Sequence, residues 1–379
     1  MSKLNLIATA TFGLEAVVKR EVEALGYTVI ASEDGKITYI GDERAVVRSN
    51  IWLRSADRVY IKLAEFQAKT FEDLFQNAAG IAWEEWIPQD GKFTVVGTAV
   101  KSDLHSVPDC QAIIKKAIVK RLQQTYDIEW FEETGSLYTI RFSLLKDRVM
   151  ILLDTSGTGL HKRGYRTHDV TAPIKETLAA AMISLSFFRL GRLMVDPLCG
   201  SGTLAIEAAM IGRNIAPGLS RKFAAEKWDA IPNEFWQQEK ELASSQINKE
   251  ADVKIIAADI DKFAIDAARA NAMNAGVDDC IEFRIVPIKN LLADEEYGMI
   301  ITNPPYGERI GDQKDLDNIY RFLTGFYETN PTWSLFFITA DKTFETKFGR
   351  PANRRRKLYN GRIETCYYQY HGQRPPKKD

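Results

Sequence analysis

Membrane-spanning and secretory segments are missing from this sequence. Its apolar runs all fall short of the roughly 20 residues that a transmembrane helix needs, and residues 1–10 are too short and too polar for a signal peptide. The composition, with 45% hydrophobic and 27% charged residues, is typical of a soluble globular protein. We therefore expect a cytoplasmic protein without a membrane anchor, and 379 residues predict two or three domains.

Paired cysteines and metal-binding motifs are also absent. The 4 cysteines lie far apart with no C-x-x-C pair, and the 4 histidines show no ligand spacing. We expect neither a disulfide nor a bound metal. The sequence gives no indication of oligomeric state.

An overall excess of positive charge is lacking, since the net charge is −1. This argues against a uniformly basic nucleic-acid coat, but the charge is unevenly distributed. Residues 341–379 hold 11 Lys or Arg against 4 Asp or Glu, and a helix expected at 108–122 has basic residues on one flank. Such clusters are candidate phosphate-binding surfaces, the alternative being an ordinary solvated face. The candidates for RNA contact here are Lys115, Lys116, Arg354, Arg355 and Arg356.

The N-terminal half predicts two small α+β units. Residues 1–66 show the order strand, helix, hairpin, helix, strand, which indicates a ferredoxin-like module. Residues 67–155 continue with helices at 71–79 and 108–122, a strand at 93–99 and a hairpin at 138–153. The run T-S-G-T-G at 155–159 is the clearest linker, and it marks the main domain boundary. A plain scaffold is the alternative for this half.

From residue 160 to 379 strands and helices alternate. Helices are expected at 173–188, 204–211, 263–275 and 316–327, and strands at 193–196, 253–259, 281–286, 298–302 and 334–339, with a final hairpin at 358–370. This pattern predicts an α/β fold with a doubly wound, mostly parallel sheet that binds ligands at the carboxyl ends of its strands. The sequence does not indicate a role for the insertion at 214–252.

A glycine-containing turn, D-P-L-C-G-S-G-T at 196–203, joins a strand to a helix. Gly200 and Gly202 let the backbone approach a ligand closely. The dinucleotide fingerprint G-x-G-x-x-G is absent because Ala205 replaces its last glycine. Asp196 would repel a pyrophosphate but suits an amino group, so a nucleoside with an amino-acid end, such as S-adenosylmethionine, fits better than NAD.

An acid also ends the next strand. Asp259 is placed to hold ribose hydroxyls, whereas Asp261 is the better candidate for a helix N-cap. The residues that we expect to contact the cofactor are Asp196, Cys199, Gly200, Gly202, Thr203, Asp259, Ile260 and Asn303.

The stretch I-I-T-N-P-P-Y-G at 300–307 is the candidate catalytic segment. Two prolines end the strand abruptly after Asn303. Asn303 and Pro304 then offer two acceptors to one amino group, and Tyr306 offers a flat face for stacking. An ordinary strand-to-loop turn is the alternative. We expect methyl transfer to an amine, with Asn303, Pro304, Pro305 and Tyr306 as the catalytic residues.

These motifs also carry a family resemblance. D-P-L-C-G-S-G-T at 196–203 and T-N-P-P-Y-G-E-R at 302–309, together with L-H-K-R-G-Y-R at 160–166, resemble the S-adenosylmethionine-dependent RNA guanine-N2 methyltransferases that have an N-terminal THUMP domain. The bacterial 23S ribosomal RNA enzymes are the most similar subgroup. The resemblance implies a class I Rossmann-like methyltransferase domain at 160–379, a THUMP RNA-binding domain at 67–155 and RNA as partner.

The basic residues within these matching segments are further candidates for RNA contact, namely Lys162, Arg163, Arg166 and Arg309. One position departs from the family pattern. Many relatives have Asp or Asn after the third strand to hold the adenine amino group, but here Pro287 occupies that place. Recognition of adenine by a side chain at this position is therefore not expected.

Several alternatives stay open at the sequence level. Guanine-N2 methylation of tRNA, adenine-N6 methylation of DNA and glutamine-N5 methylation of protein all use the same tetrapeptide, and only the N-terminal half favours RNA. An RNA-binding assembly factor with a vestigial cofactor site is a different class of function. The intact set of Asp196, Gly200, Gly202, Asp259 and Asn303 argues against it.

Overall fold

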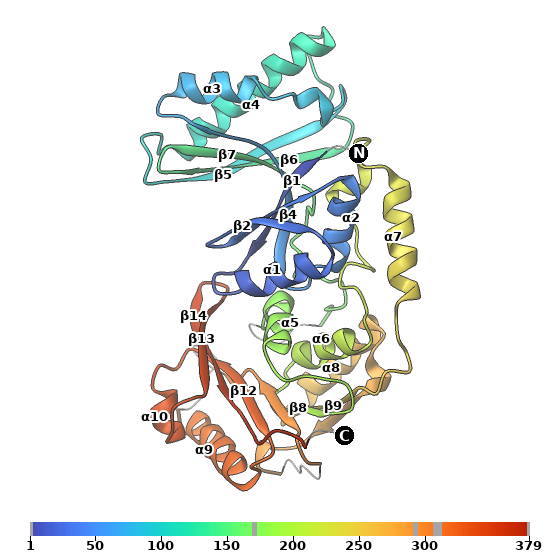
Figure 1. The fold of residues 1–379 in the computed structure, drawn as a ribbon, viewed down its shortest axis with the longest axis vertical. Coiled ribbons are helices and arrows are strands. Elements are labelled where there is room, and N and C mark those ends of the chain that lie inside the picture. Colours follow the sequence, from blue (N-terminus) through green and yellow to red (C-terminus); the bar gives the residue numbers. More distant parts are fainter. Residues whose placement is uncertain (1–2, 169–172, 291–294, 306–312, 377–379) are drawn as a thin grey trace.

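Two seven-stranded sheets form an elongated molecule in the computed structural model, which describes residues 3–168, 173–290, 295–305 and 313–376 (Figure 1). The first sheet lies at the top of Figure 1 and the second at the bottom, with helices between them. In the described part of the chain, no helix is long and apolar enough to cross a membrane. All four cysteines are free.

The N-terminal half builds the first sheet, with strand order β2-β3-β1-β4-β7-β6-β5. The predicted ferredoxin-like order is confirmed. Its elements are β1 Leu4–Ala10, α1 Glu15–Ala24, β2 Thr28–Glu33, β3 Lys36–Gly41, α2 Glu43–Trp52 and β4 Ala56–Gln67. They are followed by α3 Phe71–Ala79, β5 Lys92–Val100, α4 Val107–Tyr126, β6 Leu137–Leu145 and β7 Arg148–Asp154.

One long strand joins the two N-terminal units. The first half of β4 pairs with β1 and its second half pairs with β7, so that both units share a single sheet. The helices on either side of this strand, α2 and α3, each begin at a capping residue that is recognisable in the sequence. Asp42 accepts a hydrogen bond from the backbone of α2, and Thr70 and Asp73 form a capping box at the start of α3.

The C-terminal half builds the second sheet, with order β10-β9-β8-β11-β12-β14-β13. The strands β10, β9, β8, β11 and β12 run parallel to one another, and β14 runs antiparallel to its neighbours β12 and β13. The predicted doubly wound sheet is confirmed. Its elements are α5 Glu176–Ser184, β8 Leu193–Asp196, α6 Thr203–Gly212, β9 Lys254–Asp259, α8 Lys262–Ala275, β10 Ile281–Ile285, β11 Met299–Thr302, α9 Gln313–Thr329, β12 Ser334–Thr339, α10 Phe344–Phe348, β13 Arg354–Asn360 and β14 Ile363–Tyr370. Short 3₁₀ turns lie at Trp83–Glu85, Ala224–Lys227, Asp278–Cys280 and Ile288–Asn290.

The helix expected at 173–188 is shorter than predicted. It begins only at Glu176, because Lys175 has an extended backbone with φ −66° and ψ 140°. It ends at Ser184, with Leu185 as its last capping residue. Pro173 therefore precedes the helix and lines a cavity instead of occupying the first turn.

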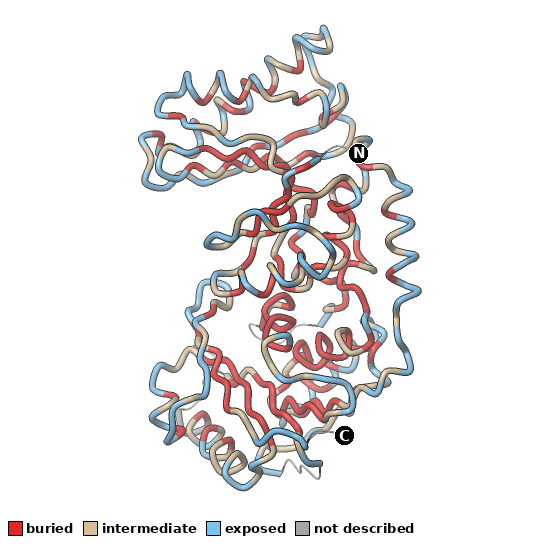
Figure 2. Tube along the Cα trace, in the orientation of Figure 1, coloured by how far each residue is buried: buried red, intermediate tan, exposed pale blue. Residues whose placement is uncertain are grey.

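A single hydrophobic core runs through both halves. It includes Leu6 of β1, Ile51 of α2, Leu178 of α5, Ile206 of α6 and Met194 of β8, all almost fully buried. Figure 2 shows this buried path from the upper sheet through the central helices to the lower sheet. A second core lies on the other face of the lower sheet, under α9 and α10. The two halves are thus packed together by the same burial of apolar surface that stabilises each sheet.

The run T-S-G-T-G, predicted as a linker, is a buried joint in the structure. The Thr155 hydroxyl donates to the carbonyl of Val59 at 2.7 Å, and the Ser156 hydroxyl donates to Asn50 Oδ1 at 2.7 Å. Thr155 and Ser156 have no exposed surface. The small polar residues that suggested a solvated linker satisfy buried polar groups of the ferredoxin-like module instead.

The insertion at 214–252, for which the sequence gave no role, bridges the two halves. Its helix α7 Asn233–Ser245 lies along α2 (Figure 1), and Trp52 Nε1 donates to Glu239 of α7 at 2.8 Å. Upstream of α7, Trp228 stacks on Tyr138 of β6 with ring centres 4.8 Å apart. Trp228 of the insertion therefore serves a contact between domains, whereas Trp236 stacks on Phe223 within the insertion itself.

Arg163 corrects one prediction of an RNA contact. It lies at the same junction, where its Nε is 3.2 Å from Glu207 Oε1 of α6, and both side chains are almost completely buried. Its Nη1 also donates to the carbonyl of Leu160 at 2.7 Å. Its Nη2 donates to the carbonyl of Arg54 in the N-terminal module. The guanidinium is therefore enclosed between that module and α6 and is not accessible to a phosphate.

This buried pair generates a test of stability. We expect Glu207→Gln to lower the free energy of unfolding by about 3–5 kcal/mol, because it leaves the buried Arg163 cation without its counter-charge. Urea unfolding followed by tryptophan fluorescence measures the change. The matched control is Glu23→Gln, which removes the exposed pair of Glu23 with Lys19 and should change stability little. Equal effects of the two variants would contradict a role for the buried pair.

Candidate active site

Three strand ends bring the predicted polar residues together. β8 pairs with β9 on one side and with β11 on the other, so Asp196, Asp259 and Asn303 all follow the carboxyl ends of adjacent parallel strands. The hydroxyl of Thr302 donates to Asp196 Oδ1 at 2.7 Å and links two of these ends directly. The convergence expected from the sequence is therefore found at one edge of the sheet.

The glycine turn is held against the same edge. Gly200 and Gly202 have φ values of +52° and +81°, in the left-handed region that favours glycine. A Cβ added to Gly202 would lie 2.9 Å from Cβ of Ala268 in α8, too close for an ordinary contact. The Gly200 N–H donates to Asp259 Oδ2 at 3.0 Å, so the turn and the end of β9 are fixed to each other.

Asp196 is a carboxylate with little solvation. It is 1% exposed, and this burial raises its pKa to about 7. Hydrogen bonds from the Thr302 hydroxyl and the Leu198 N–H act in the opposite direction, and the nearby charge of Asp259 adds to the rise. A ligand ammonium group would supply the counter-charge that this carboxylate lacks. The site therefore fits the amino-acid end of S-adenosylmethionine.

Asn303 presents an unsatisfied acceptor. Its Oδ1 is buried and has no hydrogen-bond partner among the described residues. Buried polar atoms are nearly always paired in folded proteins, so this oxygen is free to accept from a ligand. Asn303 shares a small cavity with Asp196 and with the glycine turn. The residues that line the cavity are Pro173, Ile174, Asp196, Leu198, Cys199, Gly200, Ser201, Thr203, Leu204 and Asn303.

The other predicted site residues differ from one another in how far they are exposed and in whether the structure describes them. Pro304 is buried and Pro305 is partly exposed beside Asn303, while Tyr306 and Arg309 lie outside the described residues. Ile260, directly after Asp259, is 70% exposed and is open to contact a ligand at this edge. Asp261 accepts a hydrogen bond from the Phe263 N–H at the start of α8, which confirms its interpretation as an N-cap.

Arg166 corrects a second prediction of an RNA contact. Its Nη2 donates to the Thr203 hydroxyl at 2.8 Å and to the carbonyl of Ile174 at 2.8 Å, and it lies 3.5 Å from Glu176. Its guanidinium is therefore engaged with the wall of the cavity. Arg166 thus supports the glycine turn through its hydrogen bond to the Thr203 hydroxyl.

Asn271 of α8 has a supporting role that the sequence did not reveal. This fully buried side chain donates to the carbonyl of Ser201 at 3.2 Å and accepts from the Thr167 N–H at 3.1 Å. It connects the glycine turn to the segment that carries Arg166. No sequence signal distinguishes it, because an asparagine within an alanine-rich helix is usually exposed.

The remaining basic candidates lie on the surface, with one exception. Lys115, Lys116, Lys162, Arg354 and Arg355 are exposed. Arg356 is different, since it is partly buried and its Nη1 donates to the carbonyl of Gly13 at 3.0 Å. This residue makes a contact between domains, contrary to the prediction that it binds RNA.

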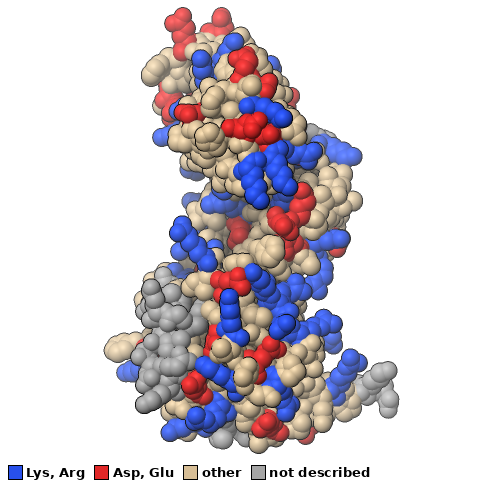
Figure 3. All heavy atoms as spheres, turned by 90° about the vertical axis from the view of Figure 1, so that its left-hand side faces the viewer, with Lys and Arg blue, Asp and Glu red and all other residues tan. Residues whose placement is uncertain are grey.

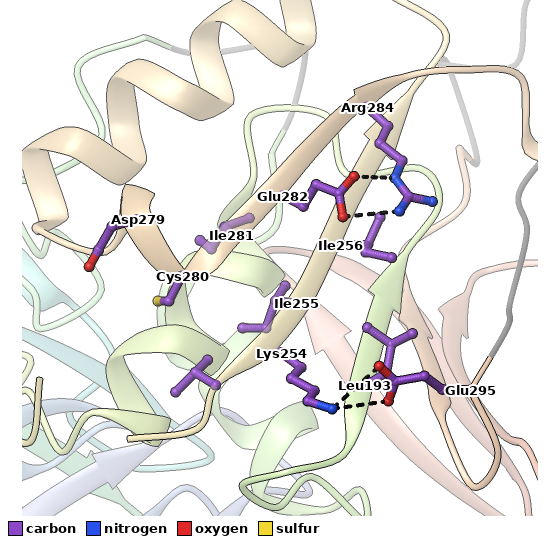
Figure 4. Close-up of a pocket in the computed structure, with 11 residues that line it drawn as sticks. Leu193, Lys254, Ile255, Ile256, Asp279, Cys280, Ile281, Glu282, Arg284 and Glu295 are labelled. Atoms are coloured by element: carbon purple, nitrogen blue, oxygen red, sulfur yellow. Dashed lines mark hydrogen bonds and ion pairs between the residues drawn. The ribbon is translucent and has the colours of Figure 1, made fainter. Parts of the chain in front are cut away.

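A second hollow lies away from these residues, at the amino ends of β8 and β9 and along β10 (Figure 4). Four of its charged side chains form pairs, Lys254 with Glu295 and Arg284 with Glu282, and Asp279 pairs with Arg213 outside the hollow. It lacks the glycine turn and lies at the wrong end of the strands for a ligand of this fold. Among the described residues, no group of three or more His, Cys, Asp or Glu side chains could hold a metal ion.

The raised pKa of Asp196 predicts how cofactor affinity depends on pH. Below pH 7 the carboxyl is increasingly neutral and attracts the cofactor's ammonium group less. We expect the Kd for S-adenosylmethionine to rise as pH falls from 7 to 5.5, by up to about tenfold per pH unit. Titration calorimetry on the wild type and on Asp196→Asn measures this. The variant should bind weakly at every pH, and a wild-type Kd that does not change with pH would contradict the account.

Three family models match the chain in consecutive segments. Residues 5–60 match the RlmL ferredoxin-like domain, residues 68–154 match the THUMP domain, and residues 163–369 match the RMKL-like methyltransferase domain. The last of these covers more than half of the chain.

Whole proteins are similar as well. YpsC of Bacillus subtilis (strain 168), named as a candidate RNA methyltransferase, is 47% identical over 100% of this chain and 99% of its own length. The ribosomal RNA large subunit methyltransferase K/L of Psychromonas ingrahamii is 35% identical over 94% of this chain. The match spans only 49% of that relative, so this chain corresponds to about half of it.

Two solved structures share the fold over nearly the full length. A predicted N6-adenine-specific DNA methylase from Listeria monocytogenes has a TM-score of 0.94 at 45% identity, with 98% of this chain and 97% of that chain covered. SMU.472, described as a candidate methyltransferase in complex with SAH, has a TM-score of 0.94 at 42% identity, with coverage of 99% and 100%. The chain therefore belongs to the family of RMKL-like, S-adenosylmethionine-dependent methyltransferases that carry an RlmL ferredoxin-like domain and a THUMP domain.

Proposed function

We propose that this enzyme methylates the exocyclic N2 amine of a guanine in RNA, with 23S ribosomal RNA as the preferred substrate. The observation that carries the proposal is Asn303 Oδ1, which is buried without a partner beside the cofactor cavity. An amide oxygen accepts hydrogen bonds, and we assign its donor to an amino group of the substrate because Asp196 is placed to take the ammonium group of the cofactor. The reaction class is therefore methyl transfer to nitrogen.

The residues of the cofactor site have distinct tasks. The Asp196 carboxylate faces the ammonium group, the turn at Gly200 and Gly202 lets the backbone approach, and Asp259 accepts from the ribose hydroxyls. S-adenosylmethionine, when bound, supplies a methyl group on a positively charged sulfur. The chain's own contribution is to hold that group at the carboxyl edge of β8 and β11, close to Asn303, in a site with little water.

The acceptors at the strand end position the nucleophile. Asn303 Oδ1 and the Pro304 carbonyl accept the two N–H bonds of the amine, which turns the nitrogen lone pair toward the methyl carbon. As the nitrogen–carbon bond forms, the carbon–sulfur bond breaks and positive charge develops on the nitrogen. The two oxygens stabilise this charge. The nitrogen then loses one proton to water, so no strong base is needed before the transfer.

The target base must leave its pairing partner to reach this edge. We expect Tyr306, which lies outside the described residues, to stack on the extruded base. RNA as substrate is supported by the THUMP match and by the ribosomal RNA named for the K/L relatives. The choice of guanine rests on the resemblance of the two motifs to guanine-N2 enzymes.

Two other substrates are candidates for the same chemistry. The name of the Listeria structure favours adenine-N6 methylation of DNA, and the same acceptor pair would hold the adenine amine. Guanine-N2 methylation of tRNA needs no change at the site. A non-catalytic assembly factor is disfavoured, because a vestigial site would have no reason to keep a buried acid, two glycines at positive φ and an unsatisfied amide together.

Incubation with labelled S-adenosylmethionine separates these possibilities. Ribosomal RNA, tRNA, DNA and protein fractions from a strain lacking the gene are each offered to the purified protein. We expect label in large-subunit ribosomal RNA. Label only in DNA or in protein would overturn the substrate assignment, and no label together with no cofactor binding would overturn the assignment as an enzyme.

Asn303→Ala tests the catalytic role of the acceptor. We expect turnover to fall by about 10²-fold or more, with the Kd for S-adenosylmethionine nearly unchanged, because Asp196, Asp259 and the glycine turn remain. Single-turnover methylation and calorimetry give the two values. The control is Asn318→Ala, an exposed asparagine on α9 that should behave as wild type. Equal losses of affinity and turnover in Asn303→Ala would give Asn303 a structural role.

A further inference from the structure

The β13–β14 hairpin extends beyond the catalytic edge of the lower sheet. Thr339 ends β12 and pairs with Cys366 of β14, which in turn pairs with Lys357 of β13. The pair formed by Tyr359 and Glu364 and the turn after it continue past that level. At about 3.3 Å per residue, the tip projects roughly 10 Å past the strand ends. The tip of the hairpin therefore lies at the carboxyl ends of the parallel strands, on the side of the sheet edge where the substrate would bind.

The N-terminal module meets this projection through one glycine. Gly13 has φ +91°, and a Cβ added there would lie 2.5 Å from the carbonyl oxygen of Lys357. Glu15 accepts hydrogen bonds from the N–H groups of Gly13 and Gly35, at 2.9 and 3.0 Å, and so fixes the loop. Arg356 donates to the Gly13 carbonyl from the other side. Phe12 is thus held at a defined place against the hairpin.

Two aromatic rings from different domains meet at this contact. Phe12 lies with its ring centre 6.0 Å from that of Tyr359, and the two ring planes make an angle of 76°. Lys357 Nζ lies 5.5 Å from the centre of the Tyr359 ring. Phe12 nevertheless remains 47% exposed. A large aromatic side chain this exposed beside a site is a candidate binding surface and not core packing.

Positive charge surrounds the two rings. Residues 354–364 contain five basic side chains against the single acid Glu364. Arg355, Lys357 and Lys342 line a hollow at the carboxyl end of β12, together with the acids Asp341 and Glu364. Figure 3 shows the face on which this hairpin lies, with many Lys and Arg side chains over its middle and lower parts and Asp and Glu side chains among them.

The ion pairs on this surface leave its cations available. Arg355 pairs with Glu345 at 3.0 Å and Lys357 pairs with Glu364 at 2.7 Å, but the two cations remain 71% and 52% exposed. Exposed pairs of this kind contribute little to stability. A phosphate can therefore replace the carboxylate as partner at small cost, with release of counterions from the nucleic acid.

We propose that Phe12, Tyr359, Lys357 and Arg355 form an aromatic and basic ridge that binds an RNA nucleotide flanking the target base. The flanking base stacks on the exposed ring of Phe12 against Tyr359, and its phosphate binds Lys357 and Arg355. β13 lies three strands from β11, about 14 Å at the usual strand spacing, which suits a neighbouring nucleotide. The ridge exists only when the N-terminal module and the hairpin are in contact. This inference rests on RNA being the substrate.

Steady-state methylation of the labelled RNA fraction tests the ridge. We expect Phe12→Ala to raise the KM for RNA at least about fivefold, the lower end of the loss found when an aromatic is removed from a base stack. The kcat and the KM for S-adenosylmethionine should stay within twofold. Phe12→Trp should retain the wild-type KM, and Phe12→Leu, which keeps bulk without a π face, should stay impaired. Arg355→Ala should reduce the salt dependence of RNA binding by about one unit of slope.

Phe187→Ala is the matched control. Phe187 is 39% exposed and packs edge-on against Phe336 with ring centres 5.3 Å apart. It also contacts the ring of His371, toward the amino end of β12 and away from the catalytic edge. It should leave the KM for RNA unchanged. If Phe12→Ala also leaves this KM unchanged, or if Phe12→Leu restores it as fully as Phe12→Trp, the ridge is a domain contact and the inference fails. The wild type's own labelling reports separately on the proposed function, since no label in RNA would remove that function whatever the variants do.

Discussion

The catalytic half depends on one buried carboxylate at the end of β8. Asp196 has almost no contact with water, and its pKa is raised to about 7 by that burial. Its hydrogen bond from Thr302 joins the strand that carries the cofactor turn to the strand that delivers Asn303. In the proposed mechanism the same side chain attracts the methyl donor, and its bond to Thr302 fixes the distance between that donor and Asn303. A shift in register of either strand would break both functions at once.

A second constraint connects the RNA-binding half to that edge. Trp52 donates to Glu239 of α7 and Trp228 stacks on Tyr138, so the insertion contacts the N-terminal half at two places. The buried Arg163 crosses the same junction by donating to the carbonyl of Arg54. The contacts are buried and directional, so the two halves form one body and not two domains on a flexible linker. Phe12 and the β13–β14 hairpin continue this connection on the substrate side.

The sequence was sufficient for the parts that follow from chain periodicity. Alternating strands and helices predicted the parallel sheet, and the acids and the Asn-Pro-Pro run at strand ends predicted which residues meet at its edge. The ferredoxin-like order was likewise readable, because a short β-α-β-β-α-β pattern permits few arrangements. The boundaries of α5 were not, since the extended backbone of Lys175 delays the start of the helix and no local sequence signal marks it.

What the sequence could not supply was the environment of individual polar side chains. Arg163, Arg166 and Arg356 look like a phosphate-binding set when only their charge is considered. Arg163 is buried against Glu207, Arg166 donates a hydrogen bond to the Thr203 hydroxyl, and Arg356 donates one to the Gly13 carbonyl. The run at 155–159 resembled a linker for the same reason, because small polar residues suit both solvent and a buried joint. Partners distant in sequence decide between these roles, and no local pattern encodes them.

The central claim concerns the atom that receives the methyl group. The most direct measurement is mass spectrometry of nucleosides after digestion of RNA methylated by the purified enzyme with isotopically labelled S-adenosylmethionine. We predict that the label appears as N2-methylguanosine and that Asn303→Ala forms it about 10²-fold more slowly or worse. Label in N6-methyladenosine, or in a base methylated on carbon, would contradict it.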